Sequence, residues 1–220
     1  MNAVNIENAT VFLSGQEILH NINWQVQRGE RCFILGANGA GKTTLVRMLM
    51  GYAWPVFGAK VEVLGHRFGT VNLQELRKRI AWVSPLMHSL RAEHLMDRTV
   101  ATMSSGEQVK VLIARALMTS PELMILDEPS VFLDIAGREF LLHTIEELAA
   151  THPELTIIFI TQRIEDILPA FDRGMILRQG HILAHGSRDA VLTEDNLRRA
   201  FDLDIRLIHA RNGRLWTVIE

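Results

Sequence analysis

A short glycine-rich segment between an apolar run and a helix-forming stretch constrains this chain more than any other feature. Residues 36–43 have the spacing G-x-x-x-x-G-K-T and follow the apolar run 32–35. A strand, a glycine loop and a helix start in this order bring backbone N–H groups and the positive end of a helix dipole to phosphate oxygens. Lys42 would reach the terminal phosphates, and the Thr43 hydroxyl would help to hold Mg²⁺.

A glycine turn that binds nothing is the alternative, but lysine and threonine in register favour a nucleoside triphosphate site. The residues predicted to hold the phosphates are Gly36, Asn38, Gly39, Ala40, Gly41, Lys42, Thr43 and Thr44.

The length of 220 residues suits one well-filled domain over residues 1–220, or one domain with small lobes, and fractions of 48% apolar and 22% charged residues are ordinary for a globular protein. A net charge of −2 gives no electrostatic footprint for nucleic acid or an anionic membrane surface. Cys32 is the only cysteine, so an internal disulfide is excluded and a reducing compartment fits. No apolar run approaches the roughly eighteen residues of a membrane span. The histidines lack ligand-like spacing, and we expect no structural metal.

The pattern of apolar residues predicts an α/β fold with a mostly parallel sheet and an N-terminal antiparallel β subdomain. Residues 4–26 alternate short apolar stretches with turns, whereas 123–126 and 157–160 are continuous apolar runs typical of strands buried on both faces. The other expected elements are strands at 61–65 and 80–83, hairpins at 175–184 and 205–218, and helices at 42–50, 73–79, 107–118 and 136–150.

Two acidic residues follow the apolar run 123–126. Asp127 is placed to bind Mg²⁺ through water, and Glu128 could polarise a water molecule for attack on the terminal phosphate. Alone, such a pair could equally cap a helix. Together with Lys42 and Thr43, it favours the chemical role.

A second anion site is indicated at residues 103–108, which read M-S-S-G-E-Q directly before a predicted helix. A serine hydroxyl, adjacent N–H groups and a helix N-terminus bind anions. Ordinary helix capping is the strong alternative when this segment is taken alone. Its position between the glycine loop and the acidic pair argues for a functional role.

In this order, the segments resemble those of the ATP-binding-cassette (ABC) ATPase family. Residues 36–43 match its Walker A motif and 123–128 its Walker B motif, 103–108 resemble the signature usually written L-S-G-G-Q, and 130–134 resemble the D-loop. The resemblance covers about residues 4–182 and is strongest to single-cassette ATPases of importers, including molybdate-type systems. It implies the P-loop core of an ABC ATPase.

The resemblance also implies roles for individual residues. Two cassettes would pair head to tail around ATP, with Asp134 crossing the interface. Glu128 would be the general base, while Lys42, Thr43 and Asp127 would hold phosphates and Mg²⁺. The residues expected to contact the nucleotide from the partner cassette are Ser104, Ser105, Gly106 and Glu107.

The resemblance also implies an aromatic side chain stacked on the adenine, and two residues of this chain compete for that position. Phe12 is the nearest aromatic residue, but alignment back from Gly29-Glu30 places Leu13 there. The base would stack on Phe12 or rest on an aliphatic side chain, and Phe12 could equally belong to the core.

Three departures from the family pattern bear on catalysis. Ser84-Pro85 stands where the family has a glutamine that senses Mg²⁺ and the attacking water. Gln162 replaces the switch histidine; it can donate a hydrogen bond to phosphate but cannot become a cation, so slower turnover is expected. Residues 86–103 are too few for the family's helical subdomain, so that subdomain is reduced or missing. Either residues were deleted or the sequence omits some, which an intact mass against 24.9 kDa would decide.

The resulting hypothesis is the ATP-hydrolysing cytoplasmic subunit of an ABC transporter, working at the inner face of the membrane with a separate transmembrane permease. An importer is favoured over an exporter by family analogy. The alternative is a slowly hydrolysing, nucleotide-gated module that regulates a soluble partner. A P-loop kinase is a distant third, because it leaves residues 103–108 unexplained.

Overall fold

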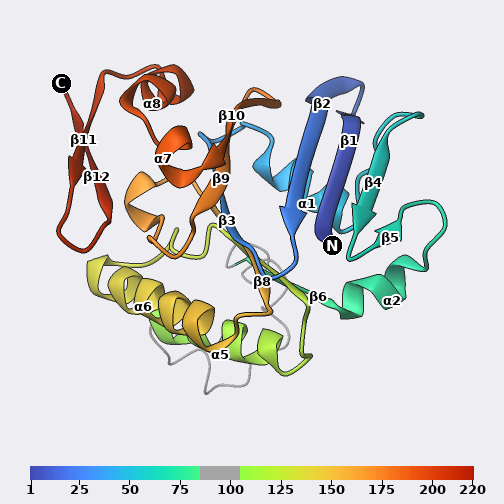
Figure 1. Ribbon diagram of the computed structural model, residues 1–220, viewed down its shortest axis with the longest axis horizontal. Helices are drawn as coiled ribbons and strands as arrows, with labels where there is room; N and C mark the ends of the chain where they lie inside the picture. Colours follow the sequence, from blue (N-terminus) through green and yellow to red (C-terminus); the bar gives the residue numbers. More distant parts are fainter. Residues whose placement is uncertain (85–104) are drawn as a thin grey trace.

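A six-stranded, mostly parallel sheet forms the centre of the molecule (Figure 1). The computed structural model describes residues 1–84 and 105–220, so the expected shortened helical region at 86–103 and Ser104 lie outside the described residues. The strand order is β10-β9-β3-β8-β7-β6, and only β10 runs antiparallel to its neighbour. The strands are β3 (Arg31–Leu35), β6 (Ile80–Val83), β7 (Leu123–Asp127), β8 (Thr156–Thr161), β9 (Arg173–Arg178) and β10 (His181–Ser187).

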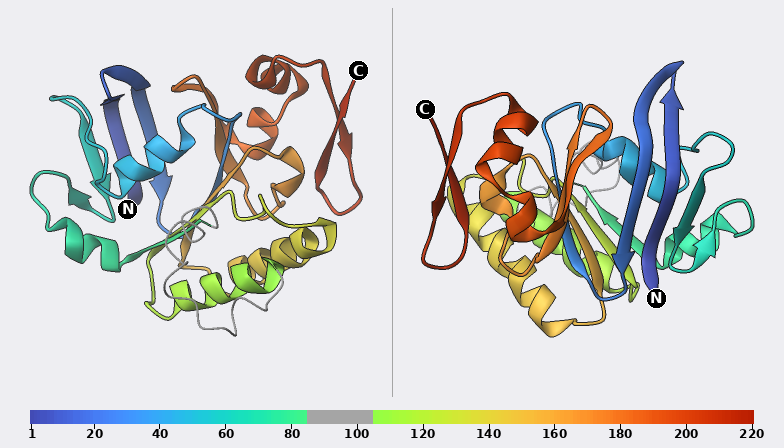
Figure 2. Two further views of the ribbon diagram at one scale, coloured as in Figure 1. Left: turned by 180° about the vertical axis from the view of Figure 1, so that it is seen from behind. Right: turned by 45° about the horizontal axis from the view of Figure 1, so that its top comes forward.

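The continuous apolar runs of this sheet are explained by cores on both of its faces. Successive side chains of a strand point to opposite faces, so Ile34 joins one core while Phe33 and Leu35 join the other. Helix α1 (Lys42–Leu49) contributes to the first core. Helices α5 (Ser105–Leu117) and α6 (Ile135–Thr151) cover the opposite face (Figure 2).

A second sheet of antiparallel strands, in the order β2-β1-β4-β5, packs on the α1 side. Its strands are β1 (Asn2–Leu13), β2 (Gln16–Gln27), β4 (Lys60–Val63) and β5 (His66–Arg67), and helix α2 (Leu73–Lys78) leads from it to β6. The predicted antiparallel β subdomain and the mostly parallel core are confirmed.

The C-terminal part continues from β8 through short elements to a separate hairpin. These elements are η2 (Ile164–Asp166), α7 (Arg188–Val191), α8 (Glu194–Phe201), β11 (Ile205–His209) and β12 (Leu215–Ile219). The expected turn at Asn212-Gly213 is present, with Gly213 in the left-handed region at φ 77°. Strands β11 and β12 pair only with each other among the described residues.

Candidate nucleotide-binding site

The glycine loop leaves the carboxyl end of β3 and turns directly into α1. The backbone N–H of Gly36 donates to Thr161 O at 3.3 Å, which joins the start of the loop to the end of β8. A Cβ atom on Gly36 would lie 2.4 Å from the carbonyl oxygen of Leu177 in β9, so only glycine fits between these strands. Gly41 takes φ 103° at the N-cap of α1, a conformation that favours glycine. The predicted phosphate loop therefore has the backbone shape that its sequence demands.

Lys42 is the first residue of α1, and its side chain points back into the loop. Its ammonium group donates to Gly36 O at 2.8 Å and to Ala37 O at 3.0 Å, and it lies 3.0 Å from Oε1 of Glu128. The lysine is 5% exposed. The structure thus brings together the loop lysine and the acidic residue that follows β7, which are 86 positions apart in the sequence.

Asp127 ends β7 and is buried beside this ion pair. Burial raises the pKa of its carboxyl group to about 6, and the charge of Glu128 adds to the rise. A hydrogen bond from Trp82 Nε1, at 3.3 Å, and the charge of Lys42 oppose it. A cation that approaches this carboxylate would remove the cost of keeping it ionised.

Trp82 is a site residue that the sequence did not single out. It lies on β6, which pairs with β7, and its register partner is Ile125. Its indole N–H reaches the Asp127 carboxylate along the sheet edge. The available signal was a tryptophan near the end of the strand expected at 80–83, but its pairing with the acidic strand is known only from the structure.

The donors expected for Mg²⁺ are oxygens of the kind that this ion prefers. Thr43 is an exposed residue in the first turn of α1 and offers a hydroxyl, and Asp127 offers a carboxylate. Within residues 1–84 and 105–220, no group of three or more His, Cys, Asp or Glu side chains could hold a metal ion. Few protein ligands are usual for Mg²⁺ in phosphate sites, where phosphate and water complete the coordination.

The segments around the acidic pair are held by a buried polar network. Glu128 has φ 49°, and its N–H donates to Ile160 O at 2.9 Å. Ser130 Oγ donates at 2.5 Å to Asp166 in η2, whose carboxylate is fully buried. Arg138 of α6 forms an ion pair with the same carboxylate at 2.9 Å. Burial raises the pKa of Asp166, while Ser130 and Arg138 oppose that rise.

The other predicted site residues lie at the edges of this network. Gln162 follows β8 directly and precedes η2. Asp134 is exposed and caps α6 by accepting a hydrogen bond from Gly137 N at 2.7 Å. Phe12 is 48% exposed near the end of β1, so the alternative that it belongs to the core is wrong. Its contact with adenine stays a prediction.

The signature segment is described only in part. Ser105, Gly106 and Glu107 form the start of α5, which packs against α6, whereas Ser104 lies outside the described residues. Their contact with a nucleotide also stays a prediction.

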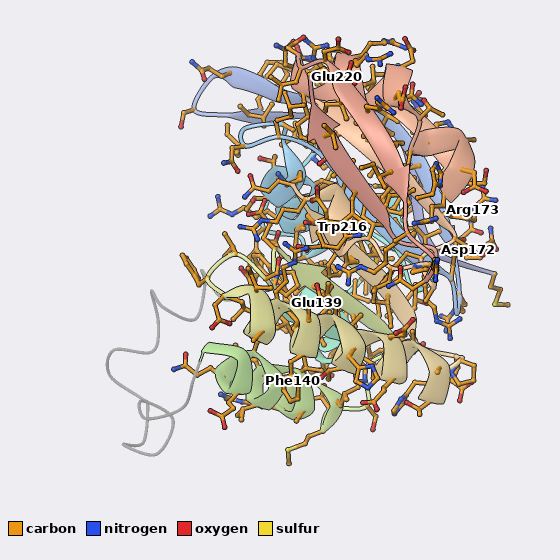
Figure 3. The ribbon with its side chains drawn as sticks, turned by 90° about the vertical axis from the view of Figure 1, so that its left-hand side faces the viewer. Glu139, Phe140, Asp172, Arg173, Trp216 and Glu220 are labelled. Carbon is orange, nitrogen blue, oxygen red and sulfur yellow. The ribbon has the colours of Figure 1, made fainter. Side chains whose placement is uncertain are left out.

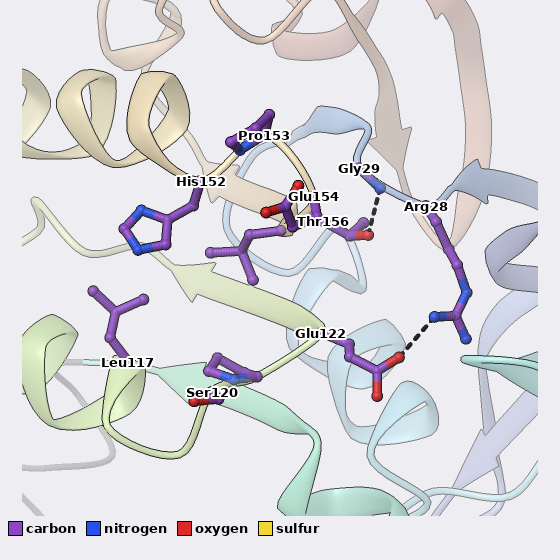
Figure 4. Close-up of a pocket in the computed structure, with 11 residues that line it drawn as sticks. Arg28, Gly29, Leu117, Ser120, Glu122, His152, Pro153, Glu154 and Thr156 are labelled. Carbon is purple, nitrogen blue, oxygen red and sulfur yellow. Dashed lines mark hydrogen bonds and ion pairs between the residues drawn. The ribbon is translucent and has the colours of Figure 1, made fainter.

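A cavity of about 610 Å³ lies at the opposite edge of the sheet from the glycine loop (Figure 4). Arg28 and Gly29 line it just before β3, Glu122 just before β7, and Thr156 at the start of β8. Because parallel strands place their carboxyl ends at one edge, this cavity and the phosphate loop are separate sites.

In a comparison with protein families, the family described as "ABC transporter" matches residues 19–131, about half of the chain. The chain belongs to the ABC transporter family. The match includes the Walker A loop, the described part of the signature segment and the Walker B strand. The resemblance seen in the sequence is therefore confirmed.

Relatives extend the similarity over nearly the whole cassette. The chain is 35% identical to the uncharacterized ABC transporter ATP-binding protein YlmA of Bacillus subtilis (strain 168), with 92% of each chain covered. It is 31% identical to the zinc import ATP-binding protein ZnuC of Wigglesworthia glossinidia brevipalpis, covering 84% of this chain and 87% of that protein. The solved structure of CbiO1 from Clostridium perfringens, part of the ABC transporter complex CbiONQ, superimposes with a TM-score of 0.74 at 23% identity. That superposition covers 90% of this chain and 93% of CbiO1.

The protein is thus an ATP-binding ABC cassette of the ATPase class that drives transport. In the described part of this cassette, no helix is both long enough and apolar enough to cross a membrane. The alignment with YlmA spans 244 positions, more than the 220 residues of this chain, so it contains positions that have no counterpart here.

Proposed function

We propose that this cassette binds Mg·ATP between residues 36–43 and the acidic pair Asp127-Glu128, and that it hydrolyses the nucleotide to power a separate transmembrane permease. The observation that carries this proposal is that two loop carbonyl oxygens and a carboxylate oxygen of Glu128 lie within 3.0 Å of the Lys42 ammonium group. A lysine held at this point is positioned to transfer its contacts from carbonyl oxygens to phosphate oxygens.

Each residue has a role that follows from its chemistry. Lys42 and the loop N–H groups would neutralise the phosphates, the Thr43 hydroxyl would help to hold Mg²⁺, and Asp127 would bind the ion through water. The metal, when bound, stabilises the charge that develops on the phosphate oxygens. Glu128 orients the attacking water and accepts its proton while the bond between the terminal phosphorus and the leaving oxygen breaks.

Gln162 directly follows β8, which pairs with β3, the strand that leads to the glycine loop. From this position its side chain would donate a hydrogen bond to the terminal phosphate. Phe12, exposed near the end of β1, would offer a face to the adenine.

The cassette is proposed to act as a head-to-tail dimer on the cytoplasmic side of the membrane. The partner's signature residues, from Ser104 to Glu107, would close over the nucleotide, with Asp134 near the interface. Phe132 and Ile135, on either side of this aspartate, are 58% and 83% exposed, and a partner could cover them. Import is favoured because a relative with 31% identity is a zinc import protein. A shortened helical subdomain at residues 86–103 is also proposed, because this stretch is too short for the helical subdomain of the family.

Steady-state phosphate release from wild-type protein and from Glu128→Gln tests the proposal. We expect the substitution to reduce the rate by about two orders of magnitude or more, since it removes the general base, while ATP affinity is retained. Glu147→Gln, on the exposed face of α6, is the matched control and should leave the rate unchanged.

Equally slow release from wild type and Glu128→Gln would reject the ATPase and favour the nucleotide-gated module. Calorimetry that detects no heat of ATP binding at millimolar nucleotide would reject both functions. Dimerisation is checked by light scattering of Glu128→Gln with Mg·ATP, where a doubled mass is expected.

A further inference from the structure

The C-terminal hairpin is held against the segment that follows the switch position. Two strands that pair only with each other are marginally stable alone, so β11 and β12 need other contacts. Ile205 and Leu215 enter the core that lies beneath α5 and α6. The N–H of Leu207 donates to Glu194 of α8 at 2.9 Å. These contacts place the turn-proximal end of β12 beside η2 and α6 (Figure 3).

Arg214 makes the central polar contact of this arrangement. Its guanidinium is bidentate to Glu139 of α6, with Nη2 at 3.0 Å from Oε1, and it holds the pKa of that carboxyl below its usual value. The same group donates to the backbone carbonyl of Glu165, from Nη2 at 2.8 Å and from Nε at 3.3 Å. Arg214 is 7% exposed. One buried planar cation therefore bridges α6 and η2, a geometry that suits arginine and not lysine.

Neighbouring contacts reinforce the same bridge. Thr217 of β12 donates its hydroxyl to the Glu165 carboxylate at 2.5 Å. The Trp216 ring lies against Arg214 and Arg138, at 5.3 and 5.8 Å from the two guanidinium carbons. Arg138 in turn forms the ion pair with Asp166. The hairpin thus contacts both residues at the end of η2, directly at Glu165 and through Arg138 at Asp166.

The bridged segment borders the chemistry on two sides. Gln162 is three positions before Glu165, and Ser130, which donates to Asp166, is two positions after Glu128. A displacement of η2 would therefore move both the switch glutamine and the chain that follows the general base. Positioning errors of about 1 Å can lower rates up to about a hundredfold.

We propose that Arg214 is a positioning residue for ATP hydrolysis, acting from the C-terminal hairpin through Glu165 and Glu139 to hold Gln162 and the Glu128 segment in place. It touches neither nucleotide nor metal, so its loss affects kcat and leaves ATP affinity unchanged. The kinetic effect rests on the ATPase activity proposed above, whereas the ordering of η2 can be measured without turnover.

The test compares Arg214→Gln with Arg206→Gln in the full chain. Arg206 is on the same hairpin but is exposed and pairs only with Glu220 among the described residues. We expect Arg214→Gln to lower kcat about tenfold while the KM for ATP stays within about twofold, and Arg206→Gln to match wild type. Arg214→Lys keeps the charge but cannot bridge both partners in one plane, so its kcat should lie between those of the two glutamine variants. Because it is the more conservative change, it also tests the role of Arg214 if Arg214→Gln fails to fold.

Hydrogen exchange supplies the second readout. The N–H groups of Asp166 and Ile167 are bonded to Arg163 O and Ile164 O, so their exchange reports on η2. Arg214→Gln should exchange faster at residues 162–168, and Arg206→Gln should not.

A lower melting temperature with unchanged kcat would show a merely structural arginine and overturn the proposal, as would unchanged exchange at η2. Absence of turnover in the wild type would instead refute the proposed ATPase activity. Hydrogen exchange at residues 162–168 would then decide by itself whether Arg214 orders η2.

Discussion

Replacing Gly36 by alanine tests whether the phosphate loop depends on its contact with β9. The added Cβ would lie 2.4 Å from Leu177 O, whereas ordinary contacts begin at 3.4 Å, so β3 and β9 must separate by about 1 Å at this point. Overpacking of this kind costs about 1–3 kcal/mol, which lowers the melting temperature of a chain this size by several degrees. The same shift moves Gly36 O, which holds Lys42. We expect ATP affinity to fall at least tenfold, an order-of-magnitude figure for misplaced contacts.

Gly174→Ala is the matched control, because its Cβ would meet the Phe33 ring at 2.5 Å in the same pair of strands but away from the loop. It should lower the melting temperature by a similar amount and leave ATP affinity within about twofold. The assay is isothermal titration calorimetry with Mg·ATP, at a temperature where both variants are folded. Wild-type affinity in Gly36→Ala, or an equal loss in both variants, would refute the reasoning.

Two further predictions concern the chemistry of the site. Gln162→His should raise the ATPase rate several-fold, because a histidine can both donate to the terminal phosphate and become a cation; an unchanged or lower phosphate-release rate would contradict this. Burial raises the pKa of Asp127 to about 6, so this carboxyl takes up a proton as the pH falls below that value and loses its affinity for a cation. Mg·ATP affinity should therefore weaken about tenfold between pH 7 and pH 5 beyond the change seen in Asp127→Asn, which corrects for titration of the nucleotide itself; parallel pH profiles in the two proteins would exclude the effect.

Sequence alone was sufficient for the parts of this protein that depend on local spacing. The loop 36–43, the acidic pair after β7 and the apolar runs of the sheet are contiguous patterns, and the expected strands, helices and hairpins follow them. A parallel sheet also places its carboxyl ends at one edge, so Lys42 and Glu128 could be expected to meet before the 3.0 Å contact was known.

Tertiary structure decided the contacts between distant segments, which no local pattern encodes. Trp82 reaches Asp127 across 45 positions and Arg214 reaches Glu139 across 75, because strand order and helix packing bring these side chains together. Phe12 illustrates the same limit, since the pattern left it between core and surface and only the packing of β1 exposed it. Local sequence patterns determine which chemical groups the candidate site contains, whereas tertiary packing determines which distant residues hold those groups in place.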